Sequence, residues 1–383
     1  MPEVSFVLPC LNEAETLEVC IREIRQCIET HGLDAEVIVA DNGSTDESAE
    51  IARRAGSIVV SVAESGYGSA LTGGFEAAQG RFLIMGDADQ SYDFREAYPM
   101  IELMRAGADM VMGSRLRGTI EPGAMPWLHR WLGNPVLSAI ARTLFRSNIS
   151  DFHCGLRGLT KQAFIEIAPH TTGMEFATEV VAKAAARGMR IEEVPVTLRP
   201  DGRSRPPHLR RWSDGWRHLR FMMTLSPRWT MLIPGLVITS TGAALILSVI
   251  AGPITIRGVR FDIHTLMVGG LLVVVGYQMM TTAVAARMFA VIEEIGPPST
   301  PIRNAFERFT LERGIVLGLS LLTAGVVLLT VVAWRWAQSG FPDLDPVVTT
   351  RPVVVATTLV ALGFQTLLMS FLLNMLAIPR RRS

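Results

Sequence analysis

Four long apolar stretches near the end of the chain constrain its fold more than any other feature. None of them contains an acidic side chain, a lysine or an arginine. A helix of roughly 20 apolar residues is long enough to cross the hydrocarbon core of a bilayer. We therefore expect an all-α transmembrane domain over residues 230–383, with four helices at about 230–252, 264–286, 314–334 and 353–378.

The arginines between these stretches predict which side of the membrane each loop occupies. They are more numerous in the second loop and at the carboxyl end than in the first and third loops. Positively charged loops tend to remain in the cytoplasm, so we expect the second loop, the carboxyl terminus and the amino-terminal domain to be cytoplasmic, at the plasma membrane of a prokaryote. The arginines are Arg287, Arg303, Arg308 and Arg313 in the second loop, Arg380, Arg381 and Arg382 at the end, Arg257 and Arg260 in the first loop, and Arg335 and Arg351 in the third.

The first 200 residues have a different pattern, in which short apolar runs of strand length alternate with helical patterns. The expected helices include residues 14–30 and 93–106. This alternation predicts an α/β domain with a parallel sheet and helices on both of its faces. The expected strands cover residues 4–8, 36–40, 57–62, 109–113 and 191–198, together with an apolar run that begins at Phe82.

A basic and aromatic segment joins the two halves. Residues 199–228 contain eight arginines and only two acids, interleaved with tryptophan, phenylalanine and methionine. Basic residues with aromatic anchors just before an apolar span are typical of helices that lie in the membrane interface. Binding to nucleic acid would not explain the spans that follow, so we expect residues 201–229 to form interfacial helices and no nucleic acid to bind.

An acidic pair, Asp87 and Asp89, follows the apolar run that begins at Phe82. In a parallel sheet the carboxyl end of a strand opens into the crevice where ligands bind. Two carboxylates at that place suit a hard divalent cation, which needs oxygen ligands and commonly joins the protein to a diphosphate. The alternative is a solvated turn, because aspartate and glycine are also common turn residues.

Other strand ends carry polar residues of more ambiguous meaning. Asn12 could cap the helix after the first strand. Asp41 closes the second strand, where it could bond a base or ribose or belong to an ordinary turn. Gly66 and Gly68 resemble a phosphate-binding loop only loosely, and such a pair is also typical of a tight turn. Glu175 and Glu179 lie on one face of a predicted helix, which we expect to be solvated.

Taken in order, these segments resemble the family 2 glycosyltransferases of the GT-A fold. The similar stretches are Phe6–Glu13, Asp41–Asp46, Gly66–Gly68, Gly86–Asp89, Gly113–Arg115 and Asp151–Arg157. The most similar branch transfers a sugar from a nucleotide to a polyprenyl phosphate, as the dolichyl phosphate mannose synthases do. The resemblance covers about the first 200 residues and implies a GT-A domain there.

The resemblance also implies roles for single residues. Donor contacts would come from Pro9, Leu11, Glu13, Asp41, Gly66, Tyr67 and Asp87, and Mg²⁺ or Mn²⁺ would lie on Asp87 and Asp89. The acceptor phosphate would meet Arg115, Arg130, Arg203, Ser204 and Arg205, and the residues expected to take part in catalysis are Asp89, Asp151 and Arg115. Relatives often place a further metal-binding glutamine two residues after the second aspartate, but this chain has Ser91 there and a glutamine at position 90.

Asp151 has two possible roles beside a purely structural one as a turn or cap residue. It could position the acceptor or act as a general base. A phosphate monoester has a second pKa of about 6, so its oxygen is largely ionised at neutral pH and hardly needs a base. The resemblance therefore favours positioning, and transfer by a single displacement would invert the anomeric carbon.

Two other functions are compatible with parts of the sequence. A processive polysaccharide synthase shares the GT-A fold, but His208 stands where its usual glutamine before Arg211 and Trp212 would be. Alternatively, the membrane half could be a lipid carrier or assembly anchor and the first domain only a donor-binding module. Small residues within the spans, as in residues 239–244, could pack inside one subunit or between subunits of a homo-oligomer.

Overall fold

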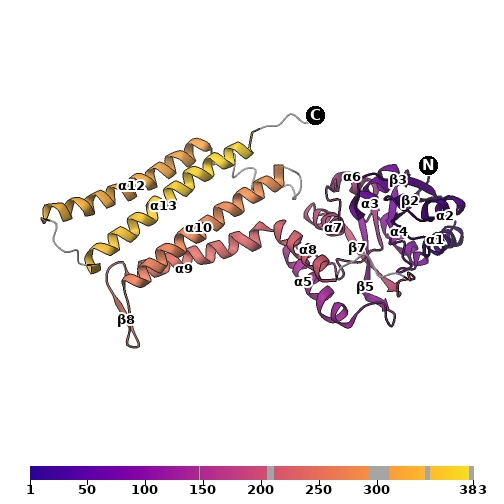
Figure 1. Ribbon diagram of the computed structural model, residues 1–383, viewed down its shortest axis with the longest axis horizontal. Coiled ribbons are helices and arrows are strands. Elements are labelled where there is room, and N and C mark those ends of the chain that lie inside the picture. Colours follow the sequence, from indigo (N-terminus) through magenta and orange to yellow (C-terminus); the bar gives the residue numbers. More distant parts are fainter. Residues whose placement is uncertain (146, 205–210, 293–309, 341–345, 379–383) are drawn as a thin grey trace. The chain divides into compact units, whose positions relative to one another are not determined.

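The computed structural model describes residues 1–145, 147–204, 211–292, 310–340 and 346–378. The chain divides into two compact units, Met1–Met222 and Met223–Ser383 (Figure 1, coloured along the sequence). The predicted interfacial segment at 201–229 extends across this boundary, and its helix α8 (Arg211–Thr224) lies almost wholly in the first unit.

A seven-stranded sheet forms the centre of the first unit. Its order is β3-β2-β1-β4-β6-β5-β7. The strands are β1 (Val4–Cys10), β2 (Ala35–Asp41), β3 (Ile58–Ser61), β4 (Phe82–Met85), β5 (Met110–Ile120), β6 (Arg157–Thr160) and β7 (Ile191–Leu198). All the predicted strands are present, because each is a short run of apolar, largely β-branched residues that packs well in a sheet.

The sheet is mixed rather than parallel, which corrects the sequence prediction. Strand β6 pairs antiparallel with β4 on one side and with β5 on the other. Because β6 runs in the opposite direction, it begins at the edge where the parallel strands end. The segment before it, Asp151–Leu156, therefore lies at the same edge as the loops that follow β1, β2 and β4.

Helices cover both faces of the sheet, and two hydrophobic clusters fill the space beneath them. Successive residues of a strand point to opposite faces. Phe6 and Leu8 accordingly join the cluster under α1 and α4, whereas Val7 joins the cluster under α3, α5, α6 and α7. The helices are α1 (Leu17–His31), α2 (Ser48–Arg54), α3 (Tyr67–Ala77), α4 (Tyr98–Arg105), α5 (Asn134–Phe145), α6 (Lys161–Ile167) and α7 (Phe176–Ala186), with shorter turns at η1 (Phe94–Ala97) and η2 (His129–Gly133).

Four long helices make up most of the second unit: α9 (Ile233–Val249) after the turn η3 (Arg228–Leu232), α10 (Ile263–Ile292), α12 (Leu311–Gln338) and α13 (Pro346–Leu376). A small hairpin, β8 (Ile254–Ile256) and β9 (Val259–Phe261), joins α9 to α10. The stretches Arg228–Val249, Ile263–Ile292, Leu311–Gln338 and Thr349–Leu376 are each long and apolar enough to cross a membrane, in agreement with the four predicted spans.

Small residues let these helices approach closely within one chain. Helix α10 packs on α9 and on α13, and α12 packs on α13, as Figure 1 shows. A Cβ atom on Gly242 would lie 2.6 Å from the carbonyl oxygen of Gly269, so this crossing of α9 and α10 requires glycine. At one end of the bundle Arg351 forms an ion pair with Asp262 at 2.5 Å.

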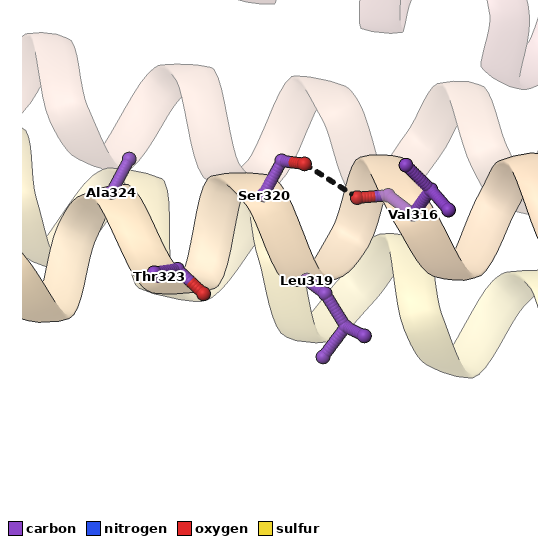
Figure 2. A pocket seen from close by; sticks show the side chains of 5 residues that line it. All are labelled: Val316, Leu319, Ser320, Thr323 and Ala324. Atoms are coloured by element: carbon purple, nitrogen blue, oxygen red, sulfur yellow. Dashed lines mark hydrogen bonds between the residues drawn. The ribbon is translucent and has the colours of Figure 1, made fainter.

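Figure 2 shows an open hollow on α12 that is lined by Val316, Leu319, Ser320, Thr323 and Ala324. The hydroxyl of Ser320 donates a hydrogen bond to the carbonyl oxygen of Val316 in the same helix, at 2.7 Å. None of its lining side chains is ionisable.

Candidate active site

The acidic pair lies where β4 ends, as the sequence predicts. The Asp87 carboxylate accepts a hydrogen bond from the Tyr67 phenol at 3.0 Å, and Asp89 accepts one from the backbone N–H of Ser91 at 3.0 Å. Burial, and after it the charge of Asp89, raises the pKa of the Asp87 carboxyl from 3.8 to about 6. A buried carboxylate with an acidic neighbour is the arrangement that a bound cation relieves.

The donor set of this pair fits a hard divalent cation only in part. Within the described residues, no group of three or more histidine, cysteine, aspartate and glutamate side chains gathers in a way that could hold a metal. A cation on Asp87 and Asp89 would therefore need further oxygen ligands from elsewhere, and diphosphate oxygens are suitable ones. Gln90, one position before the place where the resemblance implies a metal-binding glutamine, has a left-handed backbone conformation with φ of 65°.

The loops after β1 and β2 are held together by side-chain to backbone hydrogen bonds. The β1 and β2 strands end in register at Cys10 and Asp41. Asn12 accepts a hydrogen bond from the Thr45 N–H at 2.7 Å, and Ser48 accepts one from the Glu13 N–H at 2.8 Å. Four of the predicted donor residues thereby lie along one edge of the sheet. Glu13 and Asp41 are buried, whereas Pro9 and Leu11 are more exposed.

Asn42 is a further residue that the sequence analysis did not single out. Its side chain accepts a hydrogen bond from the Gly66 N–H at 2.6 Å and donates to the Val62 and Glu64 carbonyl oxygens. It thus ties the loop after β2 to the start of α3. A polar residue directly after a strand-end aspartate is the signal that could have identified it.

The Gly66–Gly68 segment makes close contact with another part of the backbone. The N–H groups of Gly68 and Ser69 both donate to the Thr172 carbonyl oxygen, at 2.8 and 3.1 Å. A Cβ atom on Gly66 would lie 2.1 Å from the same oxygen. These glycines therefore allow the 170–173 segment to approach, and the predicted donor contacts of Gly66 and Tyr67 remain a prediction.

Glu179 binds the backbone at the start of the 170–173 segment. The expectation that Glu179 lies on a solvated helix face is therefore wrong. Its carboxylate is fully buried and forms an ion pair with Lys183 at 2.6 Å. It also accepts hydrogen bonds from the N–H groups of His170 and Thr171. Burial would raise the pKa of Glu179, but its bonds to Lys183 and Thr171 outweigh that effect and lower it.

Arg115 and Asp151 form a buried pair beside the start of β6. The Arg115 Nε and Nη2 atoms donate to the two Asp151 oxygens at 2.7 and 2.8 Å. Burial would raise the pKa of Asp151, but Arg115 outweighs it, and the pKa is lowered. Glu193, which the sequence analysis missed, supports this loop by accepting a hydrogen bond from the Ser150 N–H at 2.7 Å.

The remaining arginines predicted for the acceptor lie in different surroundings. Arg130 is exposed on η2, with its guanidinium 5.5 Å from the centre of the Trp131 ring. Arg203 is nearly buried and contacts Asp89, whereas Ser204 donates to Glu15 at 2.6 Å. Arg205 and His208 lie outside the described residues.

A mixed sheet with helices on both faces and polar loops at one edge, in a chain that continues into four candidate membrane spans, is the arrangement of a membrane-attached α/β domain of the GT-A class. Residues 5–168 match the glycosyl transferase family 2, and residues 284–377 match the glycosyltransferase family 2 C-terminal transmembrane region. The chain belongs to glycosyltransferase family 2. It is an integral membrane glycosyltransferase.

Several curated proteins are similar to the chain. The low-salt glycan biosynthesis hexosyltransferase Agl6 of Haloferax volcanii is 37% identical over 98% of this chain and 89% of its own length. A dolichyl-phosphate hexose transferase of the same organism is 28% identical over 51% of this chain and 83% of its own length. The undecaprenyl-phosphate 4-deoxy-4-formamido-L-arabinose transferase of Edwardsiella ictaluri is 31% identical over 50% of this chain and 59% of its own length.

Proposed function

We propose that the chain transfers one sugar from a nucleotide donor to a polyprenyl phosphate at the cytoplasmic face of a prokaryotic plasma membrane. The observation that carries this proposal is the Asp87–Asp89 pair, half-buried at the sheet edge of a chain that also has four candidate spans. The names of two relatives, a dolichyl-phosphate and an undecaprenyl-phosphate transferase, support a lipid phosphate as acceptor.

The reaction is a single displacement. An acceptor phosphate oxygen forms a bond to the anomeric carbon while the bond from that carbon to the donor diphosphate breaks, which inverts the carbon and releases a nucleoside diphosphate. A bound Mg²⁺ or Mn²⁺ supplies charge stabilisation for the leaving diphosphate. Asp87 and Asp89 would hold that cation, and Glu13 and Asp41 would contact the base and ribose.

Arg115 is the residue that we assign to the acceptor phosphate. A guanidinium binds phosphate oxygens through paired N–H groups, and Asp151 fixes its orientation by a two-point contact. The lowered pKa of Asp151 makes this carboxyl a poor proton acceptor at neutral pH, and an ionised phosphate does not need one. Asp151 is therefore a positioning residue in this mechanism, and Arg130 would meet the lipid phosphate farther out.

An exposed aromatic patch supports the position of the first unit at the membrane surface. The patch comprises Trp127, Trp131, Leu132 and Val136, and its two tryptophans are 73% and 72% exposed. Exposed tryptophans beside arginines are typical of the interfacial layer of a bilayer. We propose that this patch and α8, which carries the exposed Trp216, rest together in the head-group layer.

The first candidate span follows α8 closely along the chain. Leu219 and Met222 of α8 pack in the same hydrophobic cluster as Leu137 of α5. Only residues 223–227 separate Met222 from the first candidate span, which begins at Arg228. This short connection supports the proposal that α8 rests at the membrane surface.

The test is an assay of purified full-length protein with polyprenyl phosphate, Mg²⁺ or Mn²⁺ and a panel of labelled nucleotide sugars. We expect labelled lipid with at least one donor, and no turnover in the folded Asp89→Asn variant. A folded protein that labels no lipid with any donor would contradict the proposal. Turnover retained by Asp89→Asn would instead reject the assigned role of the acidic pair.

A further inference from the structure

A short segment after β7 lies over the loop that carries the acidic pair. This covering segment comprises residues 199–204. The Arg199 N–H donates to the Ser91 carbonyl oxygen at 2.9 Å, and the Gly202 N–H donates to the Asp89 carbonyl oxygen at 3.0 Å. A Cβ atom on Gly202 would lie 2.1 Å from the Gln90 side-chain oxygen, so the two segments are in tight contact.

The covering segment inserts one cation among the acids of the site. Arg203 forms ion pairs with Asp89 at 2.9 Å, with Glu13 at 3.2 Å and with Asp201 at 3.1 Å, and its side chain is only 9% exposed. Asp89 lies on the loop after β4 and Glu13 on the loop after β1. One guanidinium therefore joins the two loops that the proposed mechanism assigns to the metal and the nucleotide.

Both carboxylate oxygens of Asp89 are engaged in this arrangement. Oδ1 accepts the Ser91 N–H, and Oδ2 accepts from Arg203 Nη2. The Nε atom of Arg203 is buried and makes no hydrogen bond within the described part of the chain. One N–H group of this guanidinium thus remains available for another acceptor.

We propose that Arg203 is an internal counter-cation that must leave Asp89 before a divalent cation can bind there. This inference rests on the proposed metal role of Asp89. A guanidinium and a divalent cation repel each other strongly at contact distance in a buried site, so they compete for the same carboxylate. Removal of the Arg203 charge therefore raises the affinity of the site for a divalent cation.

The exchange also connects the two substrates. When the cation and donor bind, Arg203 releases Asp89 and Glu13, and its guanidinium becomes available at the end of the covering segment. The segment is then held by fewer contacts on this side, although Ser204 still bonds to Glu15. Loading of the donor would thus free the guanidinium that the resemblance assigns to the acceptor phosphate.

The experiment measures Mn²⁺ binding to the full-length protein without nucleotide, by the electron paramagnetic resonance signal of free Mn²⁺. Arg203→Gln is compared with the wild type, and Arg199→Gln is the matched control. Arg199 belongs to the same segment and is also ion-paired, but with Glu23 and Asp93. We expect Arg203→Gln to lower the Mn²⁺ dissociation constant about tenfold or more, and Arg199→Gln to leave it unchanged.

A second measurement guards against loss of folding. Mn²⁺ should raise the midpoint of thermal unfolding more in Arg203→Gln than in the wild type, because the cation replaces the missing charge. An unchanged or weaker Mn²⁺ affinity in folded Arg203→Gln overturns the inference, while the proposed metal site stands if Asp89→Asn abolishes binding. If the wild type binds no Mn²⁺ with or without nucleotide, the metal role itself fails, and the inference fails with it.

Discussion

Substitution of Asp87 by asparagine should make the metal-free protein more stable and at the same time inactive. Asparagine keeps the shape of the side chain and an oxygen for the Tyr67 phenol, but it cannot ionise. The Asp87 carboxyl faces Asp89, Tyr67, Arg157 and Arg203, and its pKa is raised to about 6 by burial and by Asp89. A folded protein that must keep this group ionised at neutral pH loses stability.

The size of the effect follows from the shift. A rise from 3.8 to about 6 is roughly two pKa units, each worth about 1.4 kcal/mol, which makes about 3 kcal/mol in total. The folded state holds the proton more tightly than the unfolded chain. Stability therefore falls as the pH rises from about 4 to about 6, and the full loss is present above that range.

The assay is thermal unfolding of the full-length protein in detergent with EDTA, between about pH 4.5 and pH 8. At the upper end, Asp87→Asn should unfold about 6 °C or more above the wild type. Added Mn²⁺ should raise the midpoint of the wild type but not that of the variant. Equal midpoints of both proteins in EDTA, or a wild type without pH dependence in this range, would refute the reasoning.

Three further predictions concern Arg115, Gly68 and Trp131. Arg115→Ala leaves Asp151 buried without its partner and should lower the free energy of unfolding, measured with denaturant, by about 3–5 kcal/mol. Arg115→Lys should fold and show a raised KM for the lipid phosphate. An unchanged KM would contradict the assignment of Arg115 to the acceptor. Gly68→Ala places a Cβ 2.3 Å from the Thr171 carbonyl oxygen and should lower the midpoint of thermal unfolding. The control Gly133→Ala, whose Cβ would have no contact closer than 3.7 Å, should not lower it. Equal midpoints of the two variants would contradict this packing. A spin label on Trp131→Cys in nanodiscs should be protected from aqueous relaxation agents, whereas one on Ile165→Cys, also at an exposed position, should not; equal accessibility would reject the membrane patch.

Much of the fold could be predicted because the signals are local. The strand ends at Asp41 and Asp87 follow apolar runs of strand length, and the four spans are uninterrupted apolar sequences. Strand β6 escaped prediction because Arg157–Thr160 contains only one large apolar residue, Leu159, whereas the equally short strand β4 is apolar throughout. Its direction depends on both neighbouring strands, which no local pattern encodes.

Side-chain partners that are distant in the sequence could not be predicted. Glu179 is followed one helical turn later by a lysine, a spacing that is typical of an exposed ion pair. In the structure the backbone N–H groups of residues 170 and 171 donate to Glu179, and its carboxylate is buried. Arg203 contacts Asp89 and Glu13, which precede it by 114 and 190 residues. Only the assembled sheet edge brings these groups together.

The most direct test of the central claim is the mass and stereochemistry of the lipid product. With the accepted nucleotide sugar and polyprenyl phosphate, we predict a lipid phosphate that carries a single sugar, with the opposite anomeric configuration to the donor. A longer glycan on the lipid, a retained configuration, or sugar found only on water-soluble products would contradict the account.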